Sequence, residues 1–279
     1  MKIICVKFNG GLGNQLFQYA NAISHLKKND LLFFDIRNYE NDYLGRQFSI
    51  LKFDIKGKKL TNSYLIKIFS EGTKLNIFFS KLGLVKIIRE NGFFYDLSIQ
   101  HKIKSFTIFE GFWQTEKYFM QVRNKLLSEF IPLNIPSLPS VFVEANTVAV
   151  HVRRTDYISN IRYGFLGKVY YIKAIEFMKN ELENPTFIFF SDDLKWCEEN
   201  FKGANLFFFK DSQWNEDFEQ LYLISKCNHQ IIANSSFSWW GAWLNNYAQK
   251  IVVRPSVPFN DVALLYENYY PDDWVSINN

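Results

Sequence analysis

Between residues 147 and 253, short apolar strand patterns alternate with helical patterns, and few folds accommodate that order. Strands are predicted at residues 147–153, 186–190, 205–209, 230–233 and 251–253, with helices near 169–182, 195–201, 217–226 and 237–245. Strands separated by helices at this spacing are typical of a parallel, doubly wound sheet. Such a sheet binds ligands at the carboxyl ends of its strands, so functional side chains are expected there.

The N-terminal part opens with a second βαβ pattern. A strand at residues 2–8, a Gly/Asn turn, a helix at about 14–28 and a strand at 31–35 are predicted, then a strand at 107–112 and a helix at 115–130. Residues 40–105 show no recognisable pattern. Three of the seven prolines lie at 132, 136 and 139, which discourages helix and sheet there. We therefore expect two Rossmann-like domains, 1–135 and 136–279.

The composition is that of a globular protein, and it narrows the choice of partners. The chain is 48% apolar and 22% charged, and its aromatic surplus of 29 Phe, 15 Tyr and 7 Trp leaves rings for stacking on sugars. The net charge of +4 comes without long basic runs, so we expect an anionic small ligand and no nucleic acid.

Cysteine usage and apolar runs bear on the compartment. Cys5, Cys197 and Cys227 form no C-x-x-C pair, so they are interpreted as free buried thiols in a reducing, cytoplasmic compartment. No run of about 18 apolar residues and no signal peptide is found, so no membrane span is expected. Peripheral membrane association through a lipid-linked acceptor is left open.

The segment His151-Val-Arg-Arg-Thr-Asp-Tyr157 ends the first strand of the second domain. Period-2 alternation places His151 and Arg153 on one face of that strand, with Arg154 and Asp156 at its edge. Two guanidinium groups there are suited to a diphosphate, whose charge they would neutralise as a glycosidic bond breaks. The alternative is a structural Arg–Asp network at a strand end.

Two further segments follow strands of the same sheet. In Asn234-Ser-Ser-Phe-Ser-Trp-Trp-Gly241, Ser235 or Ser236 is a good N-cap, and the helix start is a ready phosphate site; an ordinary cap with buried tryptophans is the alternative. In Ser191-Asp-Asp193, Asp192 or Asp193 would accept hydrogen bonds from guanine, or simply cap a helix. No Asp-x-Asp occurs in the chain, so no metal site is expected.

Near the N-terminus, the turn containing Gly11-Leu-Gly13 half-matches a dinucleotide fingerprint, but Leu16 stands where the third glycine belongs. With Asp35 as a ribose-binding acid, the turn suggests an NAD(P)-linked oxidoreductase as the second hypothesis. Against it, Asn14 and Gln15 open the helix with amides suited to a sugar or phosphate. A non-catalytic sugar-binding protein is the third hypothesis.

Taken in order, these segments resemble the α1,2-fucosyltransferases of the bacterial and animal type, the glycosyltransferase family 11-like enzymes. The matching stretches are Gly10-Gly-Leu-Gly-Asn-Gln-Leu-Phe-Gln-Tyr-Ala20, Gly111-Phe-Trp-Gln-Thr-Glu-Lys-Tyr-Phe119, the segments at 151–157, 191–193 and 234–241, and Tyr270-Pro-Asp-Asp-Trp274. They run from end to end of the chain, which is far more specific than any single motif.

The resemblance implies a GT-B-like fold of two facing Rossmann-like domains. It also implies an inverting transfer of L-fucose from GDP-β-L-fucose to a sugar 2-hydroxyl, without a metal or other cofactor. The C-terminal domain would hold the donor and the N-terminal domain an oligosaccharide acceptor, such as a galactoside of a surface glycan.

By the same likeness Arg153 grips the diphosphate, His151 and an aspartate of 192–193 lie near guanine, and the 234–238 hydroxyls face phosphate. The predicted donor-binding residues are His151, Arg153, Arg154, Asp192, Asp193, Asn234, Ser235, Ser236, Ser238, Gly13 and Asn14; Gln15, Trp113 and Gln114 are assigned to the acceptor.

The base that takes the acceptor proton is the least determined residue. Related α1,6 enzymes have a glutamate shortly after the arginine motif, whereas residues 158–162 here contain no acid. Asp156 is the nominee, because it follows the arginines by two residues. It is equally suited to orienting Arg153 or Arg154 by an ion pair. A third alternative is that the departing phosphate accepts the proton.

Overall fold

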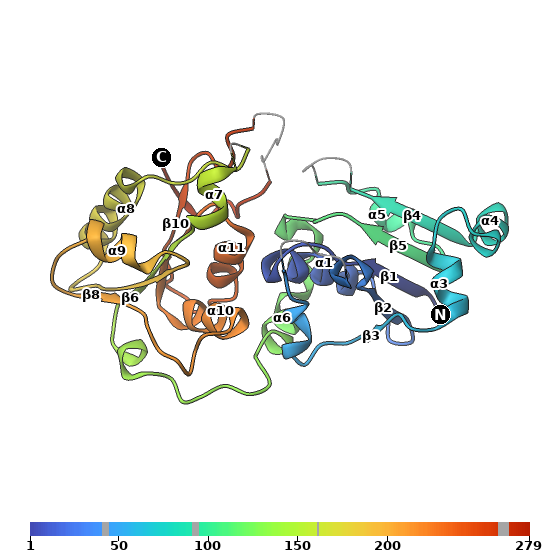
Figure 1. Ribbon diagram of the computed structural model, residues 1–279, viewed down its shortest axis with the longest axis horizontal. Helices are drawn as coiled ribbons and strands as arrows, with labels where there is room; N and C mark the ends of the chain where they lie inside the picture. The colour runs from blue at the N-terminus through green and yellow to red at the C-terminus, as the bar shows by residue number, and fades with distance from the viewer. Residues whose placement is uncertain (41–44, 91–94, 161, 262–267) are drawn as a thin grey trace. The chain divides into compact units, whose positions relative to one another are not determined.

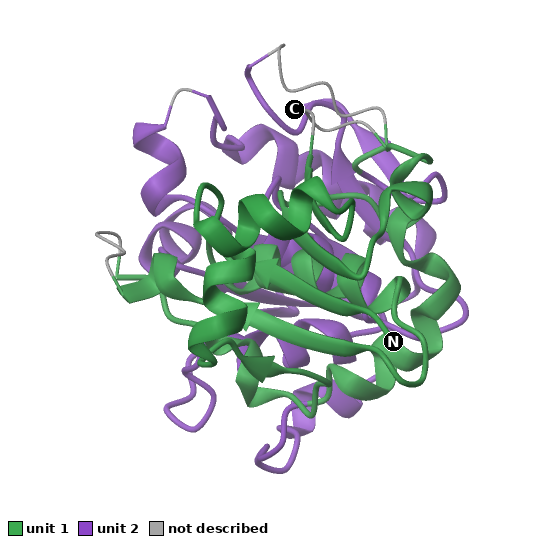
Figure 2. Cartoon of the chain, turned by 90° about the vertical axis from the view of Figure 1, so that its right-hand side faces the viewer, with its two compact units in different colours: residues 1–131, 265–269 green, residues 132–264, 270–279 purple. Residues whose placement is uncertain are grey.

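The computed structural model describes residues 1–40, 45–90, 95–160, 162–261 and 268–279 (Figure 1). The chain forms two compact units (Figure 2). Unit 1 comprises Met1–Ile131 with Leu265–Tyr269, and unit 2 comprises Pro132–Leu264 with Tyr270–Asn279. The chain thus passes from unit 1 to unit 2 at the start of the proline-rich segment, slightly before the boundary predicted between residues 135 and 136. The short return into unit 1 near the C-terminus was not predicted.

Unit 1 is built on a five-stranded parallel sheet with the order β3-β2-β1-β5-β4. Its strands are β1 (Ile3–Lys7), β2 (Leu31–Asp35), β3 (Lys58–Lys59), β4 (Val85–Arg89) and β5 (Phe106–Glu110). The central strand β1 buries Ile4, Cys5 and Val6 completely, as expected of a parallel strand covered on both faces.

The helices of unit 1 include α1 (Leu12–Ser24), α2 (Arg37–Glu40), α3 (Ser63–Phe69), α4 (Lys74–Lys81), α5 (Ile99–Lys102) and α6 (Arg123–Glu129). The 3₁₀ turns are η1 (Ser49–Lys52), η2 (Glu116–Tyr118) and η3 (Met120–Val122). The single helix predicted at 115–130 is wrong in its first half. Phe119 has a non-helical φ of −142° and is buried against Phe17, with ring centroids 5.9 Å apart, so the chain turns there before α6 begins.

Unit 2 is built on a six-stranded parallel sheet with the order β11-β10-β9-β6-β7-β8. Its strands are β6 (Thr147–Val152), β7 (Thr186–Ser191), β8 (Leu206–Phe208), β9 (His229–Ile231), β10 (Val252–Pro255) and β11 (Val275–Ile277). The predicted α/β class with two parallel sheets is confirmed. All five strands predicted here are present, and β11 was not predicted. The facing of the two units stays a prediction.

The helices of unit 2 include η4 (Ser140–Val143), α7 (Thr155–Ser159), α8 (Lys168–Glu181), α9 (Leu194–Asn200), α10 (Asp217–Lys226) and α11 (Ser236–Trp243). Trp239, Trp240 and Trp243 of α11 are buried, so the structural interpretation of these tryptophans is confirmed. Gly241 lets α10 and α11 approach closely, because a Cβ there would lie 2.4 Å from the side chain of Ile224.

Two further predictions can be compared with the fold. The three cysteines are free and buried, as predicted. Within the described ranges, no helix has both the length and the apolarity needed to cross a membrane.

Each sheet has one place where the order of its strands reverses. In unit 2 the chain moves from β6 outward through β7 and β8, then returns to β9 on the other side of β6 and continues through β10 to β11. In unit 1 the corresponding reversal lies between β1 and β5. Ligands of parallel sheets bind beside the carboxyl strand ends at such reversals, so the segments after β6, β9, β1 and β5 are the candidate ligand sites.

Candidate functional site

In unit 2 the reversal between β6 and β9 brings two of the predicted motifs together. The His151–Asp156 stretch ends β6 and the Asn234–Ser238 stretch follows β9. They are joined directly, because the hydroxyl of Ser238 lies 2.5 Å from Nδ1 of His151. Because β6 and β9 are paired in parallel, the segments at their carboxyl ends form one polar site, although 87 positions separate Ser238 from His151 in the sequence.

His151 is buried within this site and is electrically neutral. Burial, helped by the positive charge of Arg153, lowers its pKa to about 3. Its ring packs against Phe237, with centroids 5.3 Å apart. A neutral imidazole adds no charge for a diphosphate, so His151 acts here as a hydrogen-bonding and packing group.

Arg153 lies just past the end of β6, partly exposed, and two carboxylates orient its guanidinium. Its Nε and Nη2 atoms both lie 2.8 Å from Oδ1 of Asp156, and Nη1 lies 3.3 Å from Oδ2 of Asp192. This ion pair is the contact expected if Asp156 orients Arg153, which is one of the roles predicted for it.

Arg154 is held differently, against an aromatic ring. Its guanidinium carbon lies 3.9 Å from the ring centroid of Trp196, and Nε donates to Asp193 at 3.1 Å. Asp193 is also the N-cap of α9, where it accepts from the amide of Trp196 at 3.1 Å. The helix-capping interpretation of Asp193 is therefore confirmed.

Asp192 fastens the turn that carries both arginines. Its carboxylate accepts from the amides of Arg154 and Thr155 at 2.9 and 3.2 Å, and from the Thr155 hydroxyl at 2.5 Å. These contacts use most of the acceptor capacity of the carboxylate, so Asp192 holds the turn in position. Its contact with guanine stays a prediction.

The start of α11 has the cap that the sequence predicts. The hydroxyl of Ser235 accepts from the amide of Ser238 at 3.2 Å, and Ser236 is the first helical residue. Asn234 donates to the carbonyl oxygens of Tyr163, Gly164 and Pro258, at 3.1, 3.1 and 2.7 Å. Its own buried Oδ1 atom meets no donor among the described residues.

In unit 1, the segments after β1 and β5 also meet at the strand reversal. The side chain of Gln114 donates to Oδ1 of Asn14 at 2.8 Å, and that of Gln18 donates to the carbonyl of Gly111 at 3.0 Å. Asn14 lies in the first turn of α1 and is partly exposed, whereas Gly13 is buried. The structure thus brings the predicted residues Gly13, Asn14 and Gln114 to one strand-end site.

Two residues predicted to bind the acceptor are instead part of the interior, and these predictions need correction. Gln15 is fully buried, donates to the carbonyls of Gly10 and Gln47 and accepts from the amide of Ile50, so its amide is fully engaged. Trp113 is buried too, and its ring packs against Phe109 and Tyr118. Both support the turns that display Asn14 and Gln114.

Glu90 is a residue of this region that the sequence did not reveal. It follows β4, and its carboxylate accepts from the amides of Phe112 and Trp113 at 2.6 and 2.8 Å. A Cβ at Gly111 would lie 2.4 Å from Cβ of Glu90, so the glycine permits this approach. Burial raises the pKa of Glu90 to about 7, although the two amides oppose that shift.

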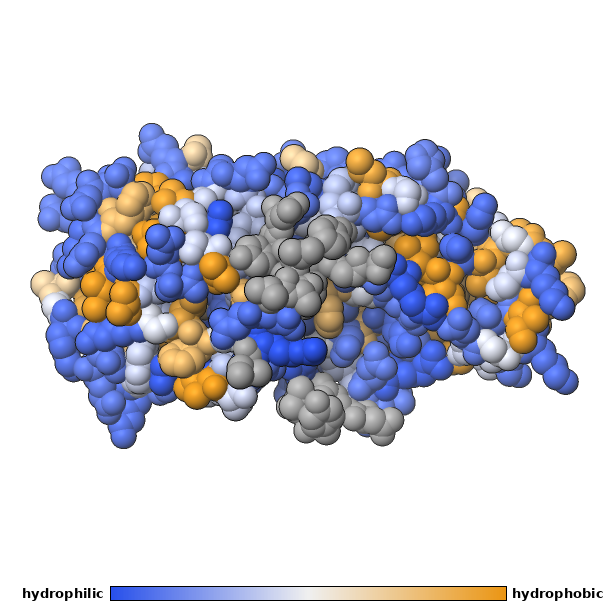
Figure 3. All heavy atoms as spheres, turned by 90° about the horizontal axis from the view of Figure 1, so that it is seen from above, coloured by the Kyte–Doolittle hydropathy of each residue, from blue (hydrophilic) through white to orange (hydrophobic). Residues whose placement is uncertain are grey.

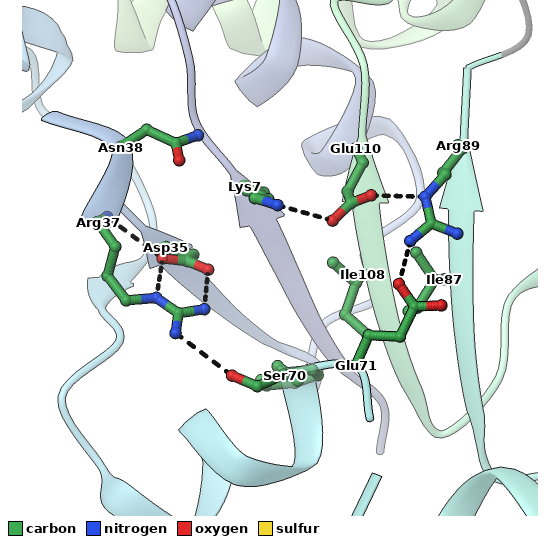
Figure 4. A pocket seen from close by; sticks show the side chains of 11 residues that line it. Lys7, Asp35, Arg37, Asn38, Ser70, Glu71, Ile87, Arg89, Ile108 and Glu110 are labelled. Atoms are coloured by element: carbon green, nitrogen blue, oxygen red, sulfur yellow. Dashed lines mark hydrogen bonds and ion pairs between the residues drawn. The ribbon is translucent and has the colours of Figure 1, made fainter. Parts of the chain in front are cut away.

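A pocket of about 410 Å³ lies over the carboxyl-end half of the unit 1 sheet (Figure 4). Its walls are ion pairs: Arg37 with Asp35, Lys7 with Glu110, and Arg89 with both Glu110 and Glu71. Asp35 is bonded bidentately by Arg37, at 2.8 and 2.6 Å, so both of its oxygens are already in use. That contact weakens the ribose-binding role of Asp35 in the oxidoreductase hypothesis.

Among the described residues, no group of three or more His, Cys, Asp and Glu side chains is arranged to hold a metal ion. The carboxylates nearest the arginines, those of Asp156, Asp192 and Asp193, are all bonded to guanidinium groups.

Comparison with known proteins gives matches over nearly the whole chain. Residues 3–278 match the family described as Glycosyl transferase family 11. An α-1,2-colitosyltransferase of Escherichia coli is 35% identical, over 99% of both chains. The O-antigen biosynthesis glycosyltransferase WbnK of Escherichia coli is 32% identical, over 88% of this chain and 92% of its own length. A galactoside α-(1,2)-fucosyltransferase 1 of Leontocebus fuscicollis is 27% identical, over 47% of this chain and 38% of its own length.

Solved structures give weaker likenesses. A variant of Arabidopsis thaliana FUT1 in complex with GDP has a TM-score of 0.49 at 11% identity, covering 90% of this chain and 70% of its own. The α-1,6-fucosyltransferase NodZ soaked with GDP-fucose has a TM-score of 0.46 at 15% identity, covering 87% of this chain and 92% of its own.

Proposed function

The chain belongs to glycosyl transferase family 11, and on that basis we propose that it transfers L-fucose from GDP-β-L-fucose to the 2-hydroxyl of a galactoside, with inversion and without a metal ion. The observation on which the proposal depends is the paired-arginine turn at the β6–β9 reversal. Neither the family match nor this strand-end site supports the oxidoreductase hypothesis or the hypothesis of a non-catalytic sugar-binding protein.

The donor diphosphate would lie at the end of β6, beside Arg153 and Arg154. A guanidinium held by carboxylates is pre-oriented, so it stabilises developing charge without reorganising during the reaction. Arg153 is partly exposed and keeps donor capacity for phosphate oxygens, whereas the guanidinium of Arg154 lies over the ring of Trp196. The free amides at the start of α11 would add a second contact to a phosphate.

Inversion requires the acceptor oxygen to attack C1 of fucose on the side opposite the diphosphate. The new C1–O bond forms as the C1–O bond to phosphate breaks, and GDP leaves with the bonding pair. The acceptor proton must be taken up as this happens. The ion pair of Asp156 with Arg153 favours the orienting role for Asp156, with the departing phosphate as the proton acceptor. A role of Asp156 as the base is the alternative, and mutation of Asp156 tests it.

The acceptor would be bound mainly by unit 1. Its partly exposed polar groups include the amide of Gln114 and that of Asn14, which the sequence assigned to the donor and which we reassign to the acceptor. The ion-paired pocket of the same unit contains Lys7 and Glu110. Carboxylate and guanidinium groups that fix one another in place are rigid partners for sugar hydroxyls.

A second donor has a specific observation in its favour. The α-1,2-colitosyltransferase is 35% identical over almost the full length of both chains, so GDP-linked colitose is the competing donor. Colitose transfer would use the same diphosphate site.

Tryptophan fluorescence titrations test the donor half of the proposal. GDP and GDP-fucose are expected to bind, with GDP-mannose weaker and NADH without effect. GDP-colitose measured beside GDP-fucose ranks the two sugars. Binding of NADH without binding of GDP would overturn the proposal, whereas preference for GDP-colitose would retain the family and change the donor.

A further inference from the structure

One segment of unit 1 has a charge that differs sharply from that of the rest of the chain. Between residues 56 and 86 there are seven lysines and one acidic residue, Glu71, a net charge of +6. The whole chain has +4, so the remaining residues sum to −2. Six of these lysines are exposed, and they take part in no ion pair with any described residue: Lys58, Lys59, Lys67, Lys74, Lys81 and Lys86.

The same segment exposes large apolar side chains beside the lysines. Tyr64 on α3 is 70% exposed, Ile77 and Phe78 on α4 are 45% and 56% exposed, and Leu82 after α4 is 57% exposed. In Figure 3, orange and blue side chains are interspersed at the right-hand end, where Figure 1 places α4. Lys58 and Lys59 lie on β3, at the opposite edge of the sheet from β4, whereas Lys67, Lys74, Lys81 and Lys86 lie on α3, α4 and β4. We call the four apolar residues and these last four lysines the α3–α4 face.

The helix α4 places four of these groups on one side. Lys74, Ile77, Phe78 and Lys81 stand at positions i, i+3, i+4 and i+7, which lie along one side of a helix. The opposite side is already used, because Leu75 and Phe79 pack on the core of unit 1. Asn76 fastens α4 to α3 through a 2.7 Å bond to the carbonyl of Ile68. The apolar outer side is therefore surplus to what the fold of unit 1 needs.

We propose that the α3–α4 face docks unit 1 on an anionic lipid membrane surface. Phe78, Ile77, Leu82 and Tyr64 would enter the boundary between headgroups and acyl chains, and the surrounding lysines would contact negatively charged headgroups. Charge argues against a second copy of this chain, because two such faces would set four lysines against four lysines. Nucleic acid would leave the four apolar side chains unmatched. This docking needs no lipid-linked acceptor and does not depend on the identity of the sugar transferred.

Vesicle co-sedimentation of the full chain, without donor or acceptor, tests the proposal. We expect binding to vesicles of phosphatidylcholine mixed with phosphatidylglycerol, little binding to phosphatidylcholine alone, and weakening as salt is added. The double variant Ile77→Ser with Phe78→Ser and the double variant Lys74→Glu with Lys81→Glu should each lose binding about tenfold or more.

Matched controls come from α8 in unit 2, which exposes the apolar side chains Val169 and Ile172 and three lysines, two of which are replaced here. Val169→Ser with Ile172→Ser, and Lys168→Glu with Lys179→Glu, should bind the vesicles like the wild type. GDP binding by tryptophan fluorescence should be unchanged in all four variants, which shows that they are folded.

Three results would overturn the proposal. The wild type could bind anionic and neutral vesicles equally at low salt, or the α8 variants could lose as much binding as the α4 variants. Third, the wild type could ignore vesicles but self-associate in sedimentation velocity, with Ile77→Ser and Phe78→Ser abolishing that association, which would make the face a contact between proteins.

Discussion

Replacing Arg153 by lysine keeps the positive charge and removes the planar guanidinium. In the structure that group meets Asp156 through Nε and Nη2 and Asp192 through Nη1, so it is oriented before a ligand arrives. A lysine ammonium is a single point donor and cannot keep this geometry while also contacting two phosphate oxygens. The loss should be about 2 to 4 kcal/mol of transition-state stabilisation, or roughly 30- to 1000-fold in kcat/KM.

The assay is steady-state turnover with the donor varied, and Arg162→Lys is the matched control. Arg162 lies in the same unit, is largely exposed and is paired with Asp261 at 3.5 Å, so its replacement should change kcat/KM less than twofold. The melting temperature of Arg153→Lys should stay near that of the wild type, since partly exposed ion pairs add little stability. Near-normal turnover of Arg153→Lys would return this arginine to a structural role.

Other perturbations separate the remaining assignments. Asp156→Asn should raise the donor KM as turnover falls, because the carboxylate orients Arg153; a loss of about 10² to 10⁴ in kcat with unchanged donor affinity would instead identify a base. Turnover should survive EDTA, and strict dependence on Mn²⁺ or Mg²⁺ would contradict the arginine assignment. Because the pKa of Glu90 is raised to about 7, its contribution to stability is present below pH 4.5 and is lost as pH rises through 7. Urea unfolding of Glu90→Gln and wild type should show the wild type losing up to about 3 kcal/mol relative to the variant over that range, and parallel pH profiles would refute this.

The alternation of strands and helices in unit 2 was predictable because central parallel strands are covered on both faces. All six residues of β6 are buried, and four of them are valine or alanine, close to the near-continuous apolar run typical of such strands. The edge strand β3 consists only of Lys58 and Lys59, both exposed, so no apolar pattern marks it. The same reason hid much of the described part of residues 40–105, where short helices and the two edge strands β3 and β4 bury few side chains.

The meeting of the candidate segments in unit 2 was also predictable, since parallel strands end at one edge of a sheet. What the sequence could not reveal is how buried polar groups choose their partners. Gln15 opens a helix in a motif that looks available for a ligand, yet its amide bonds to backbone groups of Gln47 and Ile50, more than thirty positions away. The partners of Asp192 were hidden for a similar reason, since they lie on a turn 37 or more positions away in the sequence.

Product analysis tests the central claim most directly. The chain is incubated with GDP-fucose and a defined terminal β-galactoside, and the product is examined by mass spectrometry and two-dimensional NMR. We expect one added fucose, α-linked to the galactose 2-oxygen, with release of GDP. A β-linked product, attachment at another hydroxyl, or no fucose transfer to any acceptor of a galactoside panel would contradict it.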